Sequence, residues 1–218
     1  MLENECIRIG KYLEQIDTAD LSPVILLGSN SKLNGPKGQN FISKYIIDPG
    51  ESRGVQFIHS DLSPAPGVDI SGDLFCDDVL EKLRDVIPKT IICANILEHV
   101  LSPGLLVERI SKILPSTGIA IYSVPKSFPY HPAPIDTYFR PSPRELSTLC
   151  KGSEIMVEEV VDCGSFFSQI EKKPSLIVRY VLHGLLFFID VRRALSSMHR
   201  ILWLFRGYRV SLVIAKKI

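Results

Sequence analysis

The segment from Lys89 to Arg144 constrains the fold more than any other part of the chain. Thr90–Ala94 is almost wholly apolar, as is typical of a parallel strand that is covered on both faces. A helical pattern then opens at Ser102-Pro103, and a second apolar run covers Gly118–Val124. Strand, helix and strand in this order predict parallel strands joined by a crossover helix. Ligands bind beyond the carboxyl ends of such strands, so the polar residues after each run predict the rim of a site.

The same alternation continues on both sides of this segment and predicts an α/β domain over residues 1–218. The proline-rich segment 125–141 is predicted to be a loop. A short helix at Phe41–Ile47 is expected to stop at Asp48-Pro49-Gly50. The further strands are predicted at Val24–Gly28, Val55–His59, Val68–Ile70, Ile155–Val161 and Tyr208–Ala215, and the further helices at residues 1–20, at Asp77–Val86 and after Ser142-Pro143.

Cysteine usage and charge limit the class of protein further. The five cysteines are odd in number and form no Cys-x-x-Cys pair, so we expect buried, reduced thiols in a cytoplasmic protein. The N-terminus is acidic and lacks the long apolar run of a signal peptide. No metal-ligand spacing is apparent in the sequence, so no metal site is predicted.

Basic residues are concentrated near the C-terminus. Residues 172–217 contain ten of the 25 Lys and Arg residues but one of the 24 acids. We interpret 172–207 as a basic, apolar helical insertion before the last strand, with an apolar stretch too short to span a membrane. Two hypotheses stay open for segment 176–209. In the first, it binds peripherally to an anionic membrane surface, at the inner face of the membrane. In the second, it packs on the sheet or in a homodimer interface. Nucleic acid is disfavoured as a partner because the segment is also strongly apolar.

Several motifs, taken in order, resemble one family. They are Asp61-Leu62-Ser63, the run from Gly67 to Leu74, Asn95-Ile96-Leu97-Glu98-His99-Val100, and the segment from Val124 through Tyr130-His131-Pro132 to Asp136. Together they resemble the class I S-adenosylmethionine-dependent methyltransferases over about residues 20–165 and the last strand. The resemblance implies a Rossmann-like fold, with a seven-stranded, mostly parallel sheet, helices on both faces and an antiparallel last strand. It also implies S-adenosylmethionine as cofactor and a small-molecule or glycan-type acceptor.

The resemblance assigns roles to individual residues by their position after each strand. Asp61 would accept hydrogen bonds from the cofactor ribose, and Asp73 with the Leu74 backbone would meet the adenine. Gly28, Asn30 and Asn95 would lie near the methionine part. On the acceptor side, the candidate base is His131, since imidazole titrates near neutral pH, and Tyr130, Asp136 and Arg140 would shape the pocket. Each of these residues also has an ordinary structural role open to it, as a cap, a loop hydrogen bond or a surface ion pair.

The first motif departs from the family pattern. The family carries an acidic residue, a spacer and a glycine-rich turn after the first strand, and this chain has Leu26 at the acidic position. Of the glycines, Gly28 remains, whereas Asn30 and Lys32 stand where two others are expected. A second hypothesis therefore stays open, in which the chain is a non-catalytic relative that serves as a binding or scaffold subunit. A nicotinamide-binding Rossmann domain is disfavoured, because the Gly-x-Gly-x-x-Gly fingerprint is missing.

Overall fold

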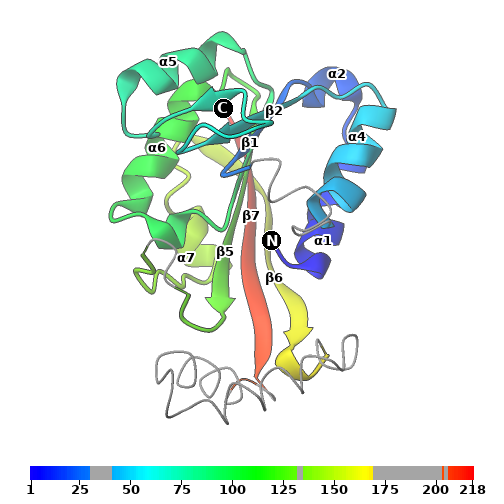
Figure 1. The fold of residues 1–218 in the computed structure, drawn as a ribbon, viewed down its shortest axis with the longest axis vertical. Helices are drawn as coiled ribbons and strands as arrows, with labels where there is room; N and C mark the ends of the chain where they lie inside the picture. The colour runs from blue at the N-terminus through cyan, green and yellow to red at the C-terminus, as the bar shows by residue number, and fades with distance from the viewer. Residues whose placement is uncertain (30–40, 132–134, 169–202, 204–205) are drawn as a thin grey trace.

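The computed structural model describes residues 1–29, 41–131, 135–168, 203 and 206–218. These residues form a seven-stranded sheet of order β3-β2-β1-β4-β5-β7-β6 (Figure 1). Strands β1 to β5 run parallel to one another, whereas β7 is antiparallel to both β5 and β6. The predicted Rossmann-like sheet with an antiparallel last strand is therefore confirmed. The strands are β1 Val24–Leu27, β2 Phe57–Asp61, β3 Ile70–Ser71, β4 Thr90–Ala94, β5 Ile119–Ser127, β6 Ser153–Ser165 and β7 Gly207–Lys217.

Helices cover both faces of the sheet (Figure 1). Successive side chains of a strand point to opposite faces, so each central strand contributes to two apolar layers. Ile25 and Ile91 pack with the layer that contains Leu83 and Leu106, whereas Leu26 packs with the layer on the other face. The first face is covered by α5 Asp77–Asp85, α6 Pro103–Ile113 and α7 Pro143–Ser147, and the other by α1 Glu3–Glu14, α2 Thr18–Leu21, η1 Ser43–Ile47 and α4 Asp48–Ser52.

Two sequence expectations that rested on proline were wrong. The helix at Phe41–Ile47 does not stop at Asp48-Pro49-Gly50, because η1 runs directly into α4. Pro49 lies at the start of α4, where the fixed φ of proline fits the helical backbone. The predicted loop 125–141 also begins later, because β5 continues through Pro125 to Ser127 with a register shift against β7. A β-bulge is a position that accepts proline within a sheet.

The five cysteines are free, and Cys6, Cys93 and Cys150 are buried, whereas Cys76 is exposed. The predicted basic insertion 172–207 lies almost wholly outside the described residues, and so does most of segment 176–209. Its binding to a membrane surface or to a second copy therefore stays a prediction. Among the described residues, no helix is both long enough and apolar enough to cross a membrane.

The helices α6 and α7 begin with the same Ser-Pro pair but are capped differently. The Ser142 hydroxyl accepts a hydrogen bond from the Glu145 N–H group at 3.2 Å, and the Glu145 carboxylate accepts one from the Ser142 N–H group at 2.7 Å. This reciprocal pair is a capping box. Ser102 occupies the equivalent position before α6, but its side chain makes no capping hydrogen bond. A serine before a proline at the start of a helix is typical of an N-cap, but of these two serines only Ser142 caps its helix with its side chain.

We expect Ser142→Ala to destabilise the protein by about 1 kcal/mol, because it removes a side-chain cap. Ser102→Ala is the matched control, since it changes the same Ser-Pro context without removing a cap. Urea denaturation followed by circular dichroism measures both variants. Equal losses of stability in the two variants would contradict this assignment.

Candidate functional site

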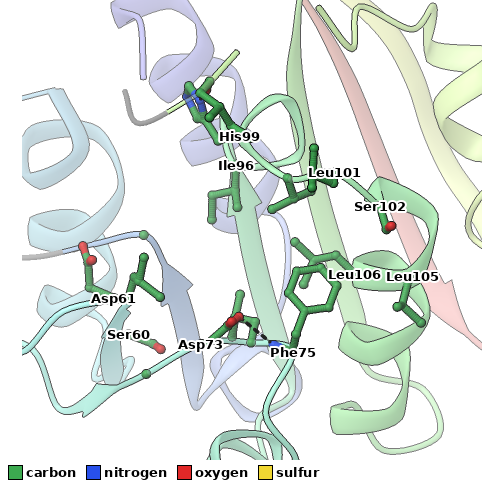
Figure 2. Close-up of a pocket in the computed structure, with 16 residues that line it drawn as sticks. Ser60, Asp61, Asp73, Phe75, Ile96, His99, Leu101, Ser102, Leu105 and Leu106 are labelled. Carbon is green, nitrogen blue, oxygen red and sulfur yellow. Dashed lines mark hydrogen bonds between the residues drawn. The ribbon is translucent and has the colours of Figure 1, made fainter. Parts of the chain in front are cut away.

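A pocket of about 530 Å³ opens at the carboxyl ends of β1, β2 and β4. Figure 2 shows Asp61 and Asp73 on one side of it, with Leu105 and Leu106 from α6 opposite and Ile96 and His99 at one end. We call this the first pocket. Because β1 pairs with β2 on one side and with β4 on the other, the crevice lies where the chain reverses its direction across the sheet. In open α/β sheets this switch point is the usual ligand site.

The two aspartates at the first pocket also organise their own turns. The Asp73 carboxylate accepts a hydrogen bond from the Phe75 N–H group at 2.9 Å, and Asp61 accepts a long one, 3.4 Å, from the Ser63 N–H group. Leu74 lines the same pocket. The fold therefore brings the predicted residues Asp61, Asp73 and Leu74 to one cavity, and both carboxylates are hydrogen-bond acceptors.

A second pocket of about 520 Å³ adjoins the first and shares Gly28, Ile96 and His99 with it. Gly28 has a φ of 65°, and a Cβ atom at this position would lie 3.1 Å from the Ile96 Cδ1 atom. Glycine therefore meets both a backbone and a steric requirement at the junction. The buried Leu26 lines the second pocket at the position where the family pattern has an acid. Asn30, predicted to belong to this turn, lies outside the described residues.

Asn95 is fixed by a buried carboxylate that the sequence analysis did not single out. Asn95 has a positive φ of 54° and donates from Nδ2 to the Glu5 Oε1 atom at 2.9 Å. The same oxygen accepts from the Ser123 hydroxyl at 2.5 Å, and Glu5 Oε2 accepts from the Leu2 N–H group at 2.8 Å. Glu5 thus ties α1 to the end of β4 and to the middle of β5. The sequence could have indicated that Glu5 is buried. Glu5, Ile9 and Leu13 are spaced four residues apart, which places them on the same buried face of α1.

Glu98 is fully buried in the 3₁₀ turn η2 Leu97–His99, directly after β4. Its Oε1 atom lies 3.7 Å from the Nε2 atoms of both His99 and His131. The Glu98 carboxylate raises the pKa of His131, partial burial opposes this, and the Pro129 carbonyl adds to the increase. Both histidines line the second pocket. The predicted candidate base His131 is thus at the second pocket, beside a carboxylate.

The other predicted acceptor-side residues organise the loop after β5. Asp136, whose side chain is fully buried, accepts from the Arg140 Nη2 atom at 2.6 Å and from the backbone N–H groups of His131 and Tyr138. Burial favours a raised pKa for Asp136, but these hydrogen bonds outweigh it and hold the pKa below its ordinary value. Tyr130 stacks on Tyr138, with ring centroids 5.0 Å apart. Within the described residues, Tyr130, Asp136 and Arg140 line neither pocket.

Comparison with protein-family models finds no match, and comparison with curated proteins finds none at the level of sequence. Comparison with solved structures does find relatives of the fold. A SAM-dependent methyltransferase from Archaeoglobus fulgidus is 13% identical with a TM-score of 0.53, and the match covers 98% of this chain and 93% of that one. The MccD protein is 14% identical with a TM-score of 0.52, over 98% of this chain and 96% of that one.

Coclaurine N-methyltransferase bound to N-methylheliamine and SAH is 16% identical with a TM-score of 0.50, over 97% of this chain and 72% of that one. At these identities the likeness concerns the fold. The chain therefore has the class I SAM-dependent methyltransferase fold, as its strand order and the sequence resemblance both indicated.

We expect Glu5→Ala to destabilise the protein by about 1–3 kcal/mol, because it leaves buried donors from Asn95 and Ser123 without their acceptor. Glu14→Ala on the exposed side of α1 is the matched control and should change stability little. Urea denaturation of both variants measures the difference. A midpoint for Glu5→Ala equal to that of the control would show that the carboxylate does not hold α1 to the sheet.

Proposed function

We propose that the protein is an S-adenosylmethionine-dependent methyltransferase that acts on a small-molecule or glycan-type acceptor. The observation that carries this proposal is the pair of adjoining pockets at the strand ends, which share Gly28, Ile96 and His99. One pocket has carboxylates at its rim, and the other has two imidazoles. Each has the volume of a typical small-molecule site. The class I methyltransferase fold of the chain supports the same assignment.

The first pocket would hold the adenosine part of the cofactor. The Asp61 carboxylate would accept hydrogen bonds from the ribose hydroxyls, because a carboxylate offers several acceptor positions to two donors. Asp73 and the Leu74 backbone would meet the adenine, against the apolar wall of Phe75 and Leu105. Gly28 and Asn95 would lie near the methionine part, on the side of the second pocket.

Methyl transfer from a sulfonium is an in-line displacement, for which the protein chiefly supplies alignment and exclusion of water. The junction at Gly28 would present the methyl group to an acceptor in the second pocket. His131 would take the acceptor proton where the acceptor must lose one, and its position at that pocket supports this role. The loop after β5 supports this role of His131 indirectly. Asp136 accepts hydrogen bonds from the His131 N–H group and from Arg140, and Tyr130 stacks on Tyr138 in the same loop.

A second candidate function, a non-catalytic binding or scaffold subunit, is favoured by Leu26. This side chain is apolar and buried where the family pattern has an acid, so the second pocket lacks that carboxylate. Calorimetry with S-adenosylmethionine and S-adenosylhomocysteine distinguishes the two functions. Absence of binding at millimolar ligand would favour the scaffold subunit.

We expect Asp61→Asn to weaken S-adenosylhomocysteine binding about 10- to 100-fold, because hydrogen bonds to a charged group contribute about 1.5–3 kcal/mol. The amide keeps the shape but has one acceptor oxygen and no charge. Asp85→Asn on the exposed side of α5 is the matched control, since it also removes a negative charge. Isothermal titration calorimetry gives the affinities. Equal affinities of the two variants would exclude the proposed role of Asp61.

We expect Gly28→Ala to weaken the same binding about fivefold, the equivalent of about 1 kcal/mol. The added methyl group would narrow the junction of the pockets next to Ile96. Gly152→Ala is the matched control, because Gly152 has a similar φ of 70° and nothing within 4 Å of an added Cβ atom. Both variants should lose similar stability, so an equal loss of affinity in both would point to backbone strain and not to the pocket.

A further inference from the structure

The surroundings of the buried Glu98 carboxylate suit a bound cation. Its side chain is fully buried, and within the described part of the chain neither of its carboxylate oxygens has a hydrogen-bond partner. A buried ionised carboxylate is costly unless it is paired or bound to a cation. The Nε2 atoms of His99 and His131 each lie 3.7 Å from Glu98 Oε1, which is too long for a hydrogen bond.

Hydrogen bonds on the far side of each ring orient the two imidazoles. His99 Nδ1 bonds to the Ile135 carbonyl, and His131 Nδ1 lies 3.0 Å from the Pro129 carbonyl and 3.3 Å from Asp136 Oδ2. These partners are acceptors, so each Nδ1 atom carries the proton. In the neutral rings, both Nε2 lone pairs then face the Glu98 carboxylate. Histidines that bind metals are typically held in this way, by a carbonyl or carboxylate at the opposite nitrogen.

The spacing of the three groups fits one cation. Donor atoms of Glu98, His99 and His131 all lie within 4.8 Å of one another. Two ligands on one tetrahedral zinc ion, each about 2.1 Å from the metal, are about 3.4 Å apart. Thr137 holds the arrangement together, because its N–H group and its hydroxyl both donate to the Glu98 carbonyl, at 2.9 and 3.0 Å. The sequence spacing gave no sign of this cluster, since His131 reaches it from the loop after β5.

We propose that Glu98, His99 and His131 bind a divalent transition-metal cation, with Zn²⁺ as the ion that this ligand set suits best. Two imidazoles and one carboxylate are a zinc ligand set that leaves a coordination position open. Both histidines line the second pocket, so the open position would face it. If the proposed methyltransferase function also holds, an acceptor would bind the cation through an oxygen atom. The cation would then assist loss of the acceptor proton in place of His131, because a metal-bound Nε2 atom has no lone pair left to accept a proton. That consequence rests on the proposed function, whereas metal binding does not.

The test measures Zn²⁺ binding to the untagged full chain after treatment with a chelator. All proteins carry Cys76→Ser, because Cys76 is an exposed free thiol that would itself bind zinc. Equilibrium dialysis should give about one Zn²⁺ per chain, and Co²⁺ in its place should give visible absorption bands of a low-coordinate site. We expect His131→Ala and Glu98→Gln each to weaken binding by more than about tenfold. His59→Gln, outside the cluster, is the matched control and should bind as tightly as the parent.

The metal site would be overturned by an absence of Zn²⁺ binding in the parent, by undiminished Zn²⁺ binding in both cluster variants, or by an equal loss in the His59→Gln control. If Glu98→Gln does not fold, His131→Ala decides, because its side chain is 30% exposed on a loop and its loss leaves the core intact. If the parent binds no Zn²⁺, protonated imidazoles of His99 and His131 would be the partners of Glu98 in place of a metal ion. Calorimetry with S-adenosylhomocysteine on the same proteins tests the proposed function separately. If the proteins bind the metal but not the cofactor, the methyltransferase function is overturned and the metal site stands.

Discussion

The two central strands, β1 and β4, are covered on both faces, and the rest of the molecule depends on that constraint. A strand buried on both faces carries apolar side chains along its whole length, so polar side chains appear only where it ends. Asn95 and Glu98 follow the end of β4, and Asp61 ends β2 at the same edge. Because these strands are parallel, their ends lie together. The concentration of polar groups at one edge of the sheet is thus a consequence of how the core is built.

The sequence predicted the order and type of the elements well, because continuous apolar runs and helical periodicity are local properties. Thr90–Ala94 was predicted residue for residue, and Asp77–Val86 differs from α5 by one residue. Element ends were predicted less well where a neighbouring segment decides them. β5 extends to Ser127 because β7 pairs with it there, and β6 and β7 are longer than predicted because they pair with each other.

The candidate site was predicted in the parts that follow directly after a strand. Asp61, Asp73 and Asn95 lie at or just after strand ends, and the family resemblance singled them out at those positions. The partners of Asn95 could not be located in this way, because Glu5 comes from a helix on one face of the sheet and meets Asn95 through the tertiary fold. The same is true of His131, whose distance from Glu98 is set by the loop that Asp136 and Thr137 hold in place.

Two buried carboxylates at this edge have opposite surroundings. Glu5 accepts hydrogen bonds from Leu2, Asn95 and Ser123, so its acceptor capacity is used in holding the fold. Glu98 faces two imidazole nitrogens beyond hydrogen-bond distance and keeps its capacity for a further partner. Similar burial thus supports two different roles, and the difference lies in the donors around each group and not in the carboxylates themselves.

The wall between the two pockets consists of Gly28, Ile96 and His99, and each of these residues belongs to both cavities. A ligand that fixes the Ile96 side chain or the His99 ring from one side therefore alters the surface that a second ligand meets on the other. Binding free energies on the two sides are then linked, and linkage is reciprocal: whatever factor the first ligand imposes on the affinity of the second, the second imposes on the first. The order in which the two ligands are added would change the path to the ternary complex but not its total free energy.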